Sequence, residues 1–358
     1  MIQTQKPHVA WDAGTAYDLF ASLHVLHHPE KFGLRGAWAA GVRSRLASSQ
    51  RSILEDAQGL LLGSQIAWVN SLPEPRDAAT VLWALGQIPP AEVLPTLAFH
   101  AGETSDILEV LKEISTRGAW DQDDLERLRS LFRQKEGLPQ PDHLVIALDW
   151  WSRPAEFGER YLGAIQAYVS SFFAEEERRI KPYLDQALTK GQELASKFEF
   201  TDLMVELSQG VKIARLEQAD EVVFVPSYWI TPLVAYDSIV ESHWVVLFGA
   251  RPADVALVPG EVVPDAMLKA LKALSDPTRL LILRYLSEKP HTPTQLARKL
   301  RLRAPTVIHH LGALRLAGLL YVSMEAEGEK HYTVREAAAR DTFESLRKFL
   351  IVRGEEKA

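Results

Sequence analysis

The hydrophobic positions between residues 13 and 217 repeat mainly with the period of a helix. In the segment beginning at Thr15, "TAYDLFASLHVLHH", one face collects Leu19, Phe20, Leu23, Leu26 and His27. The segment "FGERYLGAIQAYVSSFF" gives a second stripe, made of Phe157, Tyr161, Ile165, Tyr168, Phe172 and Phe173. Proline and glycine interrupt the pattern at 71–77, 88–90, 117–124 and 136–142. We therefore expect eight to ten helices whose aromatic stripes lie in the core.

The pattern changes near residue 220. Three short runs rich in β-branched and aromatic residues follow, "EVVFVPS" (221–227), "ITPLVAYDS" (230–238) and "HWVVLFGA" (243–250). Such runs predict three consecutive strands, and their nearly continuous apolar character predicts a sheet covered by helices on both faces. Residues 251–265 contain several prolines and a glycine and are expected to form a connector. The first domain is thus predicted to span residues 1–250.

Residues 266–352 have a pattern of their own. Two amphipathic helices, "AMLKALKALS" and "DPTRLLILRYLSEK", precede a short helix "TPTQLARKL", a tight turn and a longer helix that ends at Gly318. A short helix, a turn and a longer helix form a helix-turn-helix. The alternating segment "YVSMEAEGEKHYTVR" then predicts a two-stranded wing, and a last amphipathic helix follows. The predicted fold class is therefore mainly α with small β elements: a large N-terminal helical domain with a short sheet, and a C-terminal winged helix-turn-helix.

Charge is distributed unevenly between these parts. The whole chain has a formal net charge of −7, yet residues 264–323 contain ten Lys and Arg against three Asp and Glu. Residues 1–263 contain 23 basic against 36 acidic residues. A basic patch on an acidic body indicates a surface that faces a polyanion.

Composition and motifs exclude several classes of function. The chain of 358 residues has no cysteine, which excludes disulfides, iron–sulfur clusters and thiolate metal sites. The sequence has no apolar run long enough to span a membrane and no secretory signal pattern, so a cytoplasmic protein without membrane contact is expected. Nucleophile-elbow, phosphate-loop, dinucleotide and zinc-protease motifs are also missing, so we expect no catalytic residues and no enzymatic activity.

The run "LKALSDPTRLLILRYLSEKPHTPTQLARKLRLRAPTVIHHLGALRLAGLLYV" resembles the winged-helix domain of ArsR-type bacterial transcriptional regulators. The preceding body resembles the N-terminal part of a long-chain subgroup whose role is undefined. The resemblance implies a homodimer that binds a partly palindromic double-stranded DNA operator, most simply as a repressor, and releases it on a signal. It also implies that the first and last helices of the winged domain form the dimer contact, through Met267, Leu271, Leu274, Phe343, Leu346, Phe349 and Leu350.

Helical geometry divides the second helix of the motif into two sides. At 100° per residue, Val307, His310, Leu311 and Leu314 share the face expected to enter the core. The residues expected to contact DNA are Arg301, Arg303, Ala304, Pro305, Thr306, Ile308, His309 and Arg315, with Lys330 and His331 from the wing. In the resembled family Gly and then Ser are usual where this chain has Arg301 and Arg303. The two arginines would contact phosphates in place of the serine that caps the helix in the resembled family. Bases would then be recognised by apolar contact with thymine methyl groups and by DNA shape.

The wing departs from the resembled family because it is acidic. Glu325, Glu327 and Glu329 surround its tip, with only Lys330 and His331 to oppose them. Carboxylates near phosphates repel, so the wing could be a solvated hairpin that stays off the minor groove. An alternative function follows: an interaction protein that retains the winged-helix fold without sequence-specific DNA binding.

The signal is predicted to be a small molecule and not a metal. The family's thiolate site needs cysteines in the helix "PTQLARKL", and its second site needs histidine in the last helix; this chain has neither. His24 and His28 have a zinc-compatible spacing but need a third ligand such as Glu30, and an exposed polar flank explains the pair more simply. An apolar effector pocket is predicted around Tyr228, Trp229, Tyr236 and Trp244, although such aromatics are more often core and the N-terminal domain could instead organise the dimer. No cofactor is expected.

Overall fold

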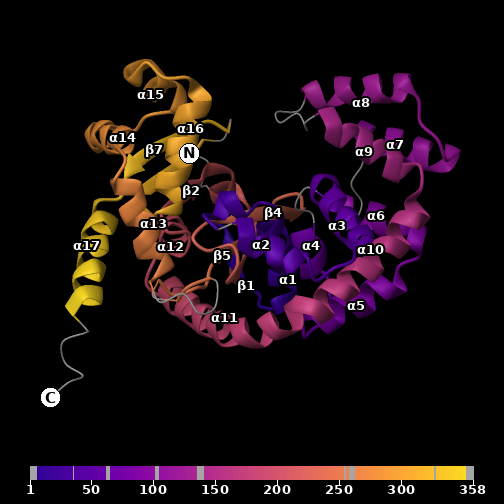
Figure 1. The fold of residues 1–358 in the computed structure, drawn as a ribbon, viewed down its shortest axis with the longest axis horizontal. Coiled ribbons are helices and arrows are strands. Elements are labelled where there is room, and N and C mark those ends of the chain that lie inside the picture. Colours follow the sequence, from indigo (N-terminus) through magenta and orange to yellow (C-terminus); the bar gives the residue numbers. More distant parts are fainter. Residues whose placement is uncertain are drawn as a thin grey trace.

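A computed structural model describes residues 6–34, 36–61, 65–100, 105–134, 141–253, 255–257, 263–325 and 328–351. The chain divides into an N-terminal part of helices and a small sheet, and a C-terminal part of five helices and a hairpin (Figure 1). In Figure 1 the C-terminal part, orange to yellow, lies at the opposite end from helices α7, α8 and α9. Within the described ranges, no helix is long and apolar enough to cross a membrane.

The N-terminal part holds twelve α-helices in its described residues, more than the eight to ten expected from the sequence. They are α1 (Thr15–His27), α2 (Gly36–Arg43), α3 (Ser48–Leu60), α4 (Gln65–Asn70), α5 (Ala78–Gln87), α6 (Pro90–Ala98), α7 (Asp106–Arg117), α8 (Gln122–Gln134), α9 (Pro141–Trp151), α10 (Pro154–Tyr168), α11 (Ala174–Ala195) and α12 (Phe200–Leu207). Short helical turns lie at η1 (Pro29–Phe32), η2 (Val169–Phe173) and η3 (Ala214–Gln218). The number was underestimated because α2, α4 and α12 have only six to eight residues, so each repeats the helical period about twice at most.

The two predicted stripes enter the main core. Five of the apolar residues of α1 and α10, Leu19, Leu23, Phe157, Ile165 and Tyr168, are at most 2% exposed. A single π-helical turn, η2, joins α10 to α11, so that Phe172 and Phe173 also point inward. Helix α11 then runs along the lower edge of the molecule in Figure 1 toward the C-terminal part.

Three strands form in the predicted region, although the middle one starts at Ala235 and not at residue 230, and a fourth strand joins them. Strands β3 (Glu221–Ser227), β4 (Ala235–Val240) and β5 (His243–Gly249) form a sheet with β1 (His8–Trp11), in the order β1-β3-β5-β4. Strands β1 and β5 are parallel to β3, and β4 is antiparallel to β5. Alternate residues feed two cores: Val223 and Val245 face one, whereas Phe224 and Val246 face the other beside α12. Both faces of the sheet are therefore covered, as expected.

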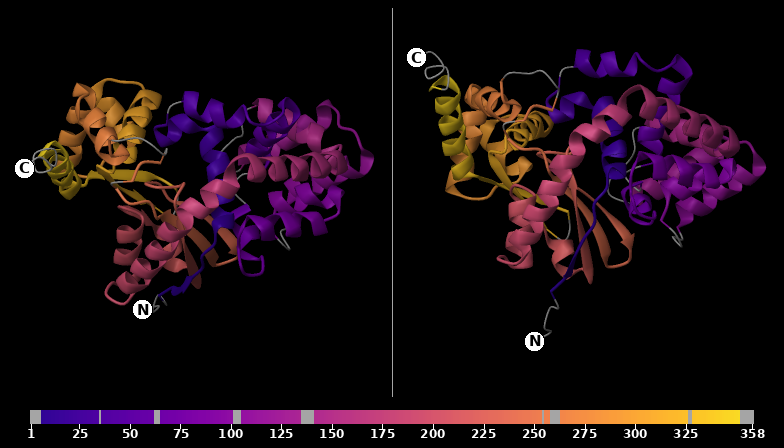
Figure 2. Two further views of the ribbon diagram at one scale, coloured as in Figure 1. Left: turned by 60° about the horizontal axis from the view of Figure 1, so that its bottom comes forward. Right: turned by 90° about the horizontal axis from the view of Figure 1, so that it is seen from below.

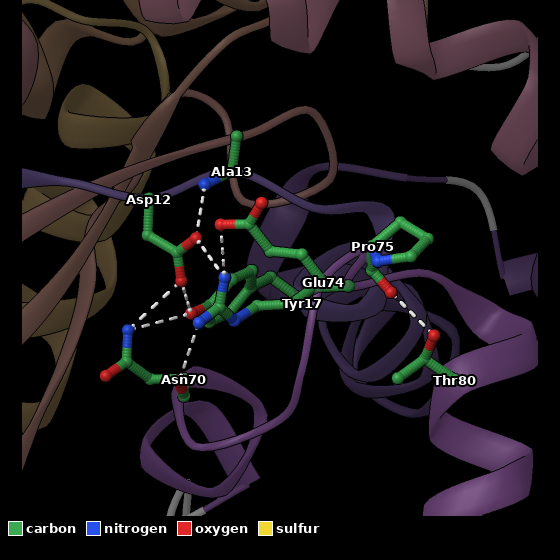
Figure 3. Close-up of polar contacts among 8 residues, drawn as sticks. Asp12, Ala13, Tyr17, Asn70, Glu74, Pro75 and Thr80 are labelled. Carbon is green, nitrogen blue, oxygen red and sulfur yellow. Dashed lines mark hydrogen bonds and ion pairs between the residues drawn. The ribbon is translucent and has the colours of Figure 1, made fainter.

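Two carboxylates, of the half-buried Asp12 and the buried Asp18, tie α1 to the sheet. Asp12, at the end of β1, accepts hydrogen bonds from the Tyr17 hydroxyl, the Asn70 amide and Arg76 (Figure 3). Asp18 is fully buried and accepts hydrogen bonds from the Ser227 hydroxyl and from the backbone N–H groups of Tyr228 and Trp229, at 2.7–3.1 Å. Burial raises the pKa of Asp18 to about 6. These contacts fix the chain where it leaves β1 and β3.

The C-terminal part is a winged helix-turn-helix. It comprises α13 (Asp265–Leu274), α14 (Pro277–Glu288), α15 (Pro293–Leu300), α16 (Ala304–Leu316), β6 (Leu320–Met324), β7 (Lys330–Val334) and α17 (Glu336–Ile351). Its core contains Ile282, Leu286, Leu296, Val307 and Leu311. Asp276 caps α14 by accepting a hydrogen bond from the Arg279 N–H, and Pro277 occupies the first turn. The hairpin of β6 and β7 is the predicted wing.

The two parts share a sheet, which the sequence did not predict. Strand β2 (Val211–Ile213), from the N-terminal part, pairs in parallel with β6 and gives the order β2-β6-β7. Gly210, with φ 103°, lies so close to Tyr321 that a Cβ atom would come within 2.5 Å of its ring. Its carbonyl accepts a hydrogen bond from the Val322 N–H at 2.7 Å. Strand β6 of the wing is therefore held, at Val322–Met324, by residues outside the winged domain.

Candidate nucleic-acid interface

Helix α15, the first helix of the helix-turn-helix, is fixed by hydrogen bonds at both of its ends. Thr292 caps α15 through a reciprocal pair of hydrogen bonds with Gln295. The helix ends at Arg301, whose backbone is left-handed (φ 55°, ψ 39°), and the Leu302 N–H returns to the Ala297 carbonyl at 3.0 Å. Glycine is the usual residue in this conformation, since a Cβ atom makes it cost about 1–2 kcal/mol. An arginine here indicates that its side chain serves another purpose.

Helix α16 has one buried side and one exposed side. Val307, Leu311 and Leu314 are at most 1% exposed and pack into the winged domain, as the helical angles predict. His310 is half-buried, and burial lowers its pKa. The adjacent His309 is exposed. The structure therefore confirms the division of the two histidines into an inner and an outer residue.

The predicted DNA contacts of the turn and of the first half of α16 gather on the exposed side. We call this group the recognition surface: Arg301, Arg303, Pro305, Thr306, Ile308 and His309, all exposed, with Ala304 half-buried beside them. Ile308, a large apolar residue, is 56% exposed on this side of the helix. Arg303 is the N-cap residue of α16 and its side chain accepts no capping hydrogen bond. Pro305 has no N–H, and the Thr306 N–H is bonded to the Arg303 carbonyl at 3.1 Å. The two arginines and the positive end of the helix dipole therefore make this helix start favourable for phosphate.

Arg315 does not belong to this surface, which corrects the sequence-based prediction. Its side chain is 8% exposed. The guanidinium donates hydrogen bonds to the carbonyls of Ser208 (2.9 Å) and Gln209 (3.3 Å), in the loop just before β2. Burial lowers its pKa to about 10. The helical angles placed Arg315 on a flank of α16, but the N-terminal part covers that flank, so Arg315 is buried and bonded to protein carbonyls.

The wing presents both charges. Lys330 is exposed, and His331 lies half-buried, 4.0 Å from a carboxylate oxygen of Glu325 and 4.0 Å from one of Glu329. Gly328 turns the chain with φ 87°. Glu327, the third predicted acid, lies outside the described residues. The acids flank His331 from two sides, so the described tip carries no surplus of positive charge.

Two basic residues adjoin the recognition surface and were missed from the sequence. Arg298 and Lys299 are exposed in the last turn of α15, next to Arg301. Lys299 lies with its ammonium 4.8 Å from the centre of the Tyr285 ring, which steadies it. The local charge of the segment was visible in the sequence, but which of its cations point outward was not.

The four aromatics predicted to line an effector pocket do not form one, and that grouping is wrong. Tyr228 and Trp229 are fully buried in the core on one face of the sheet. Tyr236 and Trp244 pack together on the other face, with ring centres 6.0 Å apart. Tyr228 and Trp229 lie in the loop after β3, whereas Tyr236 lies on β4 and Trp244 on β5. The loop residues and these two strand positions face opposite sides of the sheet, which separates the two pairs.

The predicted zinc spacing of two histidines is realised without a third ligand. The rings of His24 and His28 lie 4.7 Å apart, and His24 also contacts Phe32 edge-on. Burial lowers the pKa of His24 to about 4. Within the part of the chain that is described, no group of three or more His, Cys, Asp or Glu residues gathers at one point.

Comparison with known proteins agrees with this geometry. The family described as "Bacterial regulatory protein, arsR family" matches residues 276–322, which extend from the start of α14 into β6. A solved structure of an ArsR family transcriptional regulator is 22% identical, over 26% of this chain and 91% of that one, with a TM-score of 0.22. None of the curated proteins matches the chain. Residues 276–322 are therefore an ArsR-type helix-turn-helix, a domain of bacterial regulatory proteins.

Proposed function

We propose that the protein is a homodimeric repressor that binds a partly palindromic operator through α16 and leaves it when a small organic molecule binds. The observation that carries the DNA-binding step is the recognition surface. Arg301 and Arg303 lie at the start of a helix whose N-terminal half is exposed over the length that a major groove admits. Phosphate contacts from the arginines would set the register, while Ile308 and His309 would face base edges.

The dimer is supported by the exposed apolar side chains of α17. This helix lies at the outer edge of the winged domain, away from the N-terminal part (Figure 2). Phe343 and Leu350 are 59% and 67% exposed in the single chain. On α13, by contrast, Met267 is already buried within the chain. A two-fold partner that covered α17 would remove an apolar stripe from water and set the spacing of two recognition surfaces.

Fluorescence anisotropy with a generic DNA duplex tests the DNA-binding step. The affinity should fall steeply between low and moderate salt, because neutralised phosphates release counterions. Changing Arg301→Ser together with Arg303→Ser should weaken binding to every sequence alike and lower the log–log salt slope by up to about two. Arg340→Ser, an exposed arginine of α17, is the matched control and should leave the slope unchanged. A flat salt response, or no binding at low salt, would refute the proposal.

His309→Ala tests base reading. On a palindrome from the gene's own upstream region the variant should lose about 1–3 kcal/mol, with little change on random duplex. An equal loss on both duplexes would contradict the role assigned to His309.

A second function, an interaction protein without sequence-specific DNA binding, is supported by the acidic wing. Glu325 and Glu329 bracket His331 and would repel a phosphate backbone that approached the tip. The anisotropy experiment separates the two functions, since only the regulator shows the salt-dependent binding.

A further inference from the structure

A cavity of about 490 Å³ lies between the N-terminal part and the winged domain. Leu34, Ala37 and Trp38 line it on the N-terminal side, the last two from the first turn of α2. Leu268 of α13 and Leu316 of α16 line it on the other side. Its volume is in the range of sites that hold small organic ligands, and such sites often occur where domains meet.

The apolar wall is held rigid by a stack of aromatic rings. Trp38 stacks on Trp229 with ring centres 5.7 Å apart and an angle of 21°, and Phe172 meets both rings edge-on. Phe172 belongs to the π-helical turn η2, a feature that occurs often at functional sites. The indole nitrogen of Trp229 is buried and has no hydrogen-bond partner among the described residues. Trp38, which lines the cavity, is therefore held in place by its packing on Trp229 and Phe172.

The opposite wall has a surplus of positive charge. Lys269 pairs with Asp265 at 2.8 Å and also donates to the Phe32 carbonyl at 2.6 Å. Lys272 and Arg279 form no ion pair within 4 Å in the described ranges, and Arg279 uses one N–H on the Lys272 carbonyl. Glu30, exposed on the far side, is the other acidic side chain that lines the cavity. Two cations on α13 and α14 thus face apolar surface across the cavity.

We propose that this cavity is the effector site, and that it binds an organic carboxylate with an apolar body. The apolar body would lie on Trp38 and Leu34, and the carboxylate would be bound by Lys272 and Arg279. Ala313 and Leu316 of the recognition helix form part of the wall, so the ligand would touch the element that binds DNA. The regulatory meaning of the site rests on the proposed function; the binding of the carboxylate does not.

Isothermal titration of the full chain with naphthalene-2-carboxylate and with decanoate tests the site. Each carboxylate should bind at least ten-fold more tightly than its neutral counterpart, naphthalene-2-carboxamide or decan-1-ol. Lys272→Gln with Arg279→Gln should remove this preference, while Lys289→Gln, an exposed lysine outside the cavity, should retain it. Ala37→Trp should abolish binding of acid and neutral compound alike, because the indole would occupy the cavity.

Three results would overturn the inference: no binding of either carboxylate, equal affinity for acid and neutral compound, or unchanged affinities in the glutamine double variant. Thermal melts of each variant show whether it is folded, and the glutamine pair remains informative if Ala37→Trp does not fold. DNA anisotropy on the same preparations separates the two proposals. DNA binding without carboxylate binding refutes the effector site alone, whereas carboxylate binding without DNA binding refutes the proposed function alone.

Discussion

The left-handed backbone at Arg301 makes a prediction in which strain and charge can be separated. Arg301→Ala keeps the Cβ atom and the strained conformation but removes the guanidinium. Arg301→Gly removes both. A non-glycine residue in this conformation costs about 1–2 kcal/mol, and glycine returns roughly 0.5–1 kcal/mol of this through the freedom of its unfolded chain. The glycine variant should therefore be more stable than the alanine variant by up to about 1 kcal/mol.

Native-state amide hydrogen exchange is the assay, because it reports the local opening free energy of α15 and α16. Tryptophan fluorescence would not report it, since all nine tryptophans lie between Trp11 and Trp244. Slower exchange in the glycine variant, with an equal loss of DNA affinity in both variants, is the expected result. The salt slope should fall by about 0.9 in each. If the glycine variant exchanged faster than the alanine variant, or if the alanine variant bound DNA as the unchanged protein does, the reasoning would be refuted.

Three further predictions concern buried and exposed groups away from the recognition surface. Arg315→Met should leave two carbonyls unpaired and cost about 1–3 kcal/mol, seen as faster exchange at β2 and β6 with an unchanged DNA salt slope; a lower slope would show that Arg315 contacts phosphate. The free energy of unfolding should fall as the pH rises through about 6, because the pKa of Asp18 in the folded protein lies above the ordinary 3.8. Relative to Asp18→Asn, the protein should lose about 3 kcal/mol between pH 4 and 7 in denaturant titrations followed by tryptophan fluorescence; a constant difference would contradict this. Phe343→Glu with Leu350→Glu should yield monomers by sedimentation at micromolar concentration, and an intact dimer would place the contact elsewhere.

The elements that the sequence predicted well are those with a long local pattern. The stripe on α10, the strands β3 and β5, and the capped helices α14 and α15 each contain enough residues to show their period or their cap. Strand β2 has three residues and no turn signal of its own. It is a strand because β6 lies beside it, and nothing local in the sequence encodes that neighbour.

The candidate site was predicted only in part, because only some of its features follow from a local pattern in the sequence. Helical angles separate the inner from the outer side of α16, so the exposure of Ile308 and His309 follows from the sequence. The angles cannot tell which flank another part of the chain covers, and Arg315 was misplaced on that account. The cavity at Trp38 has no sequence signal at all, because its walls come from helices that are far apart in the chain.

The pairing of β2 with β6 has a consequence for how the chain is made and folded. Val211 of β2 pairs with Val322 of β6, and the two residues are far apart in the sequence. Parallel strand pairings of such long sequence separation form late and slowly in folding. During synthesis, β2 and the preceding helix α12 are complete well before β6 emerges from the ribosome. The strand edge of β2 therefore stays unpaired until the wing has been made. In a winged domain expressed alone, the outer edge of β6 would be unpaired and open to pairing with other chains. Aggregation of such a fragment, and slow joining when the two halves are mixed, are the kinetic signature of this arrangement.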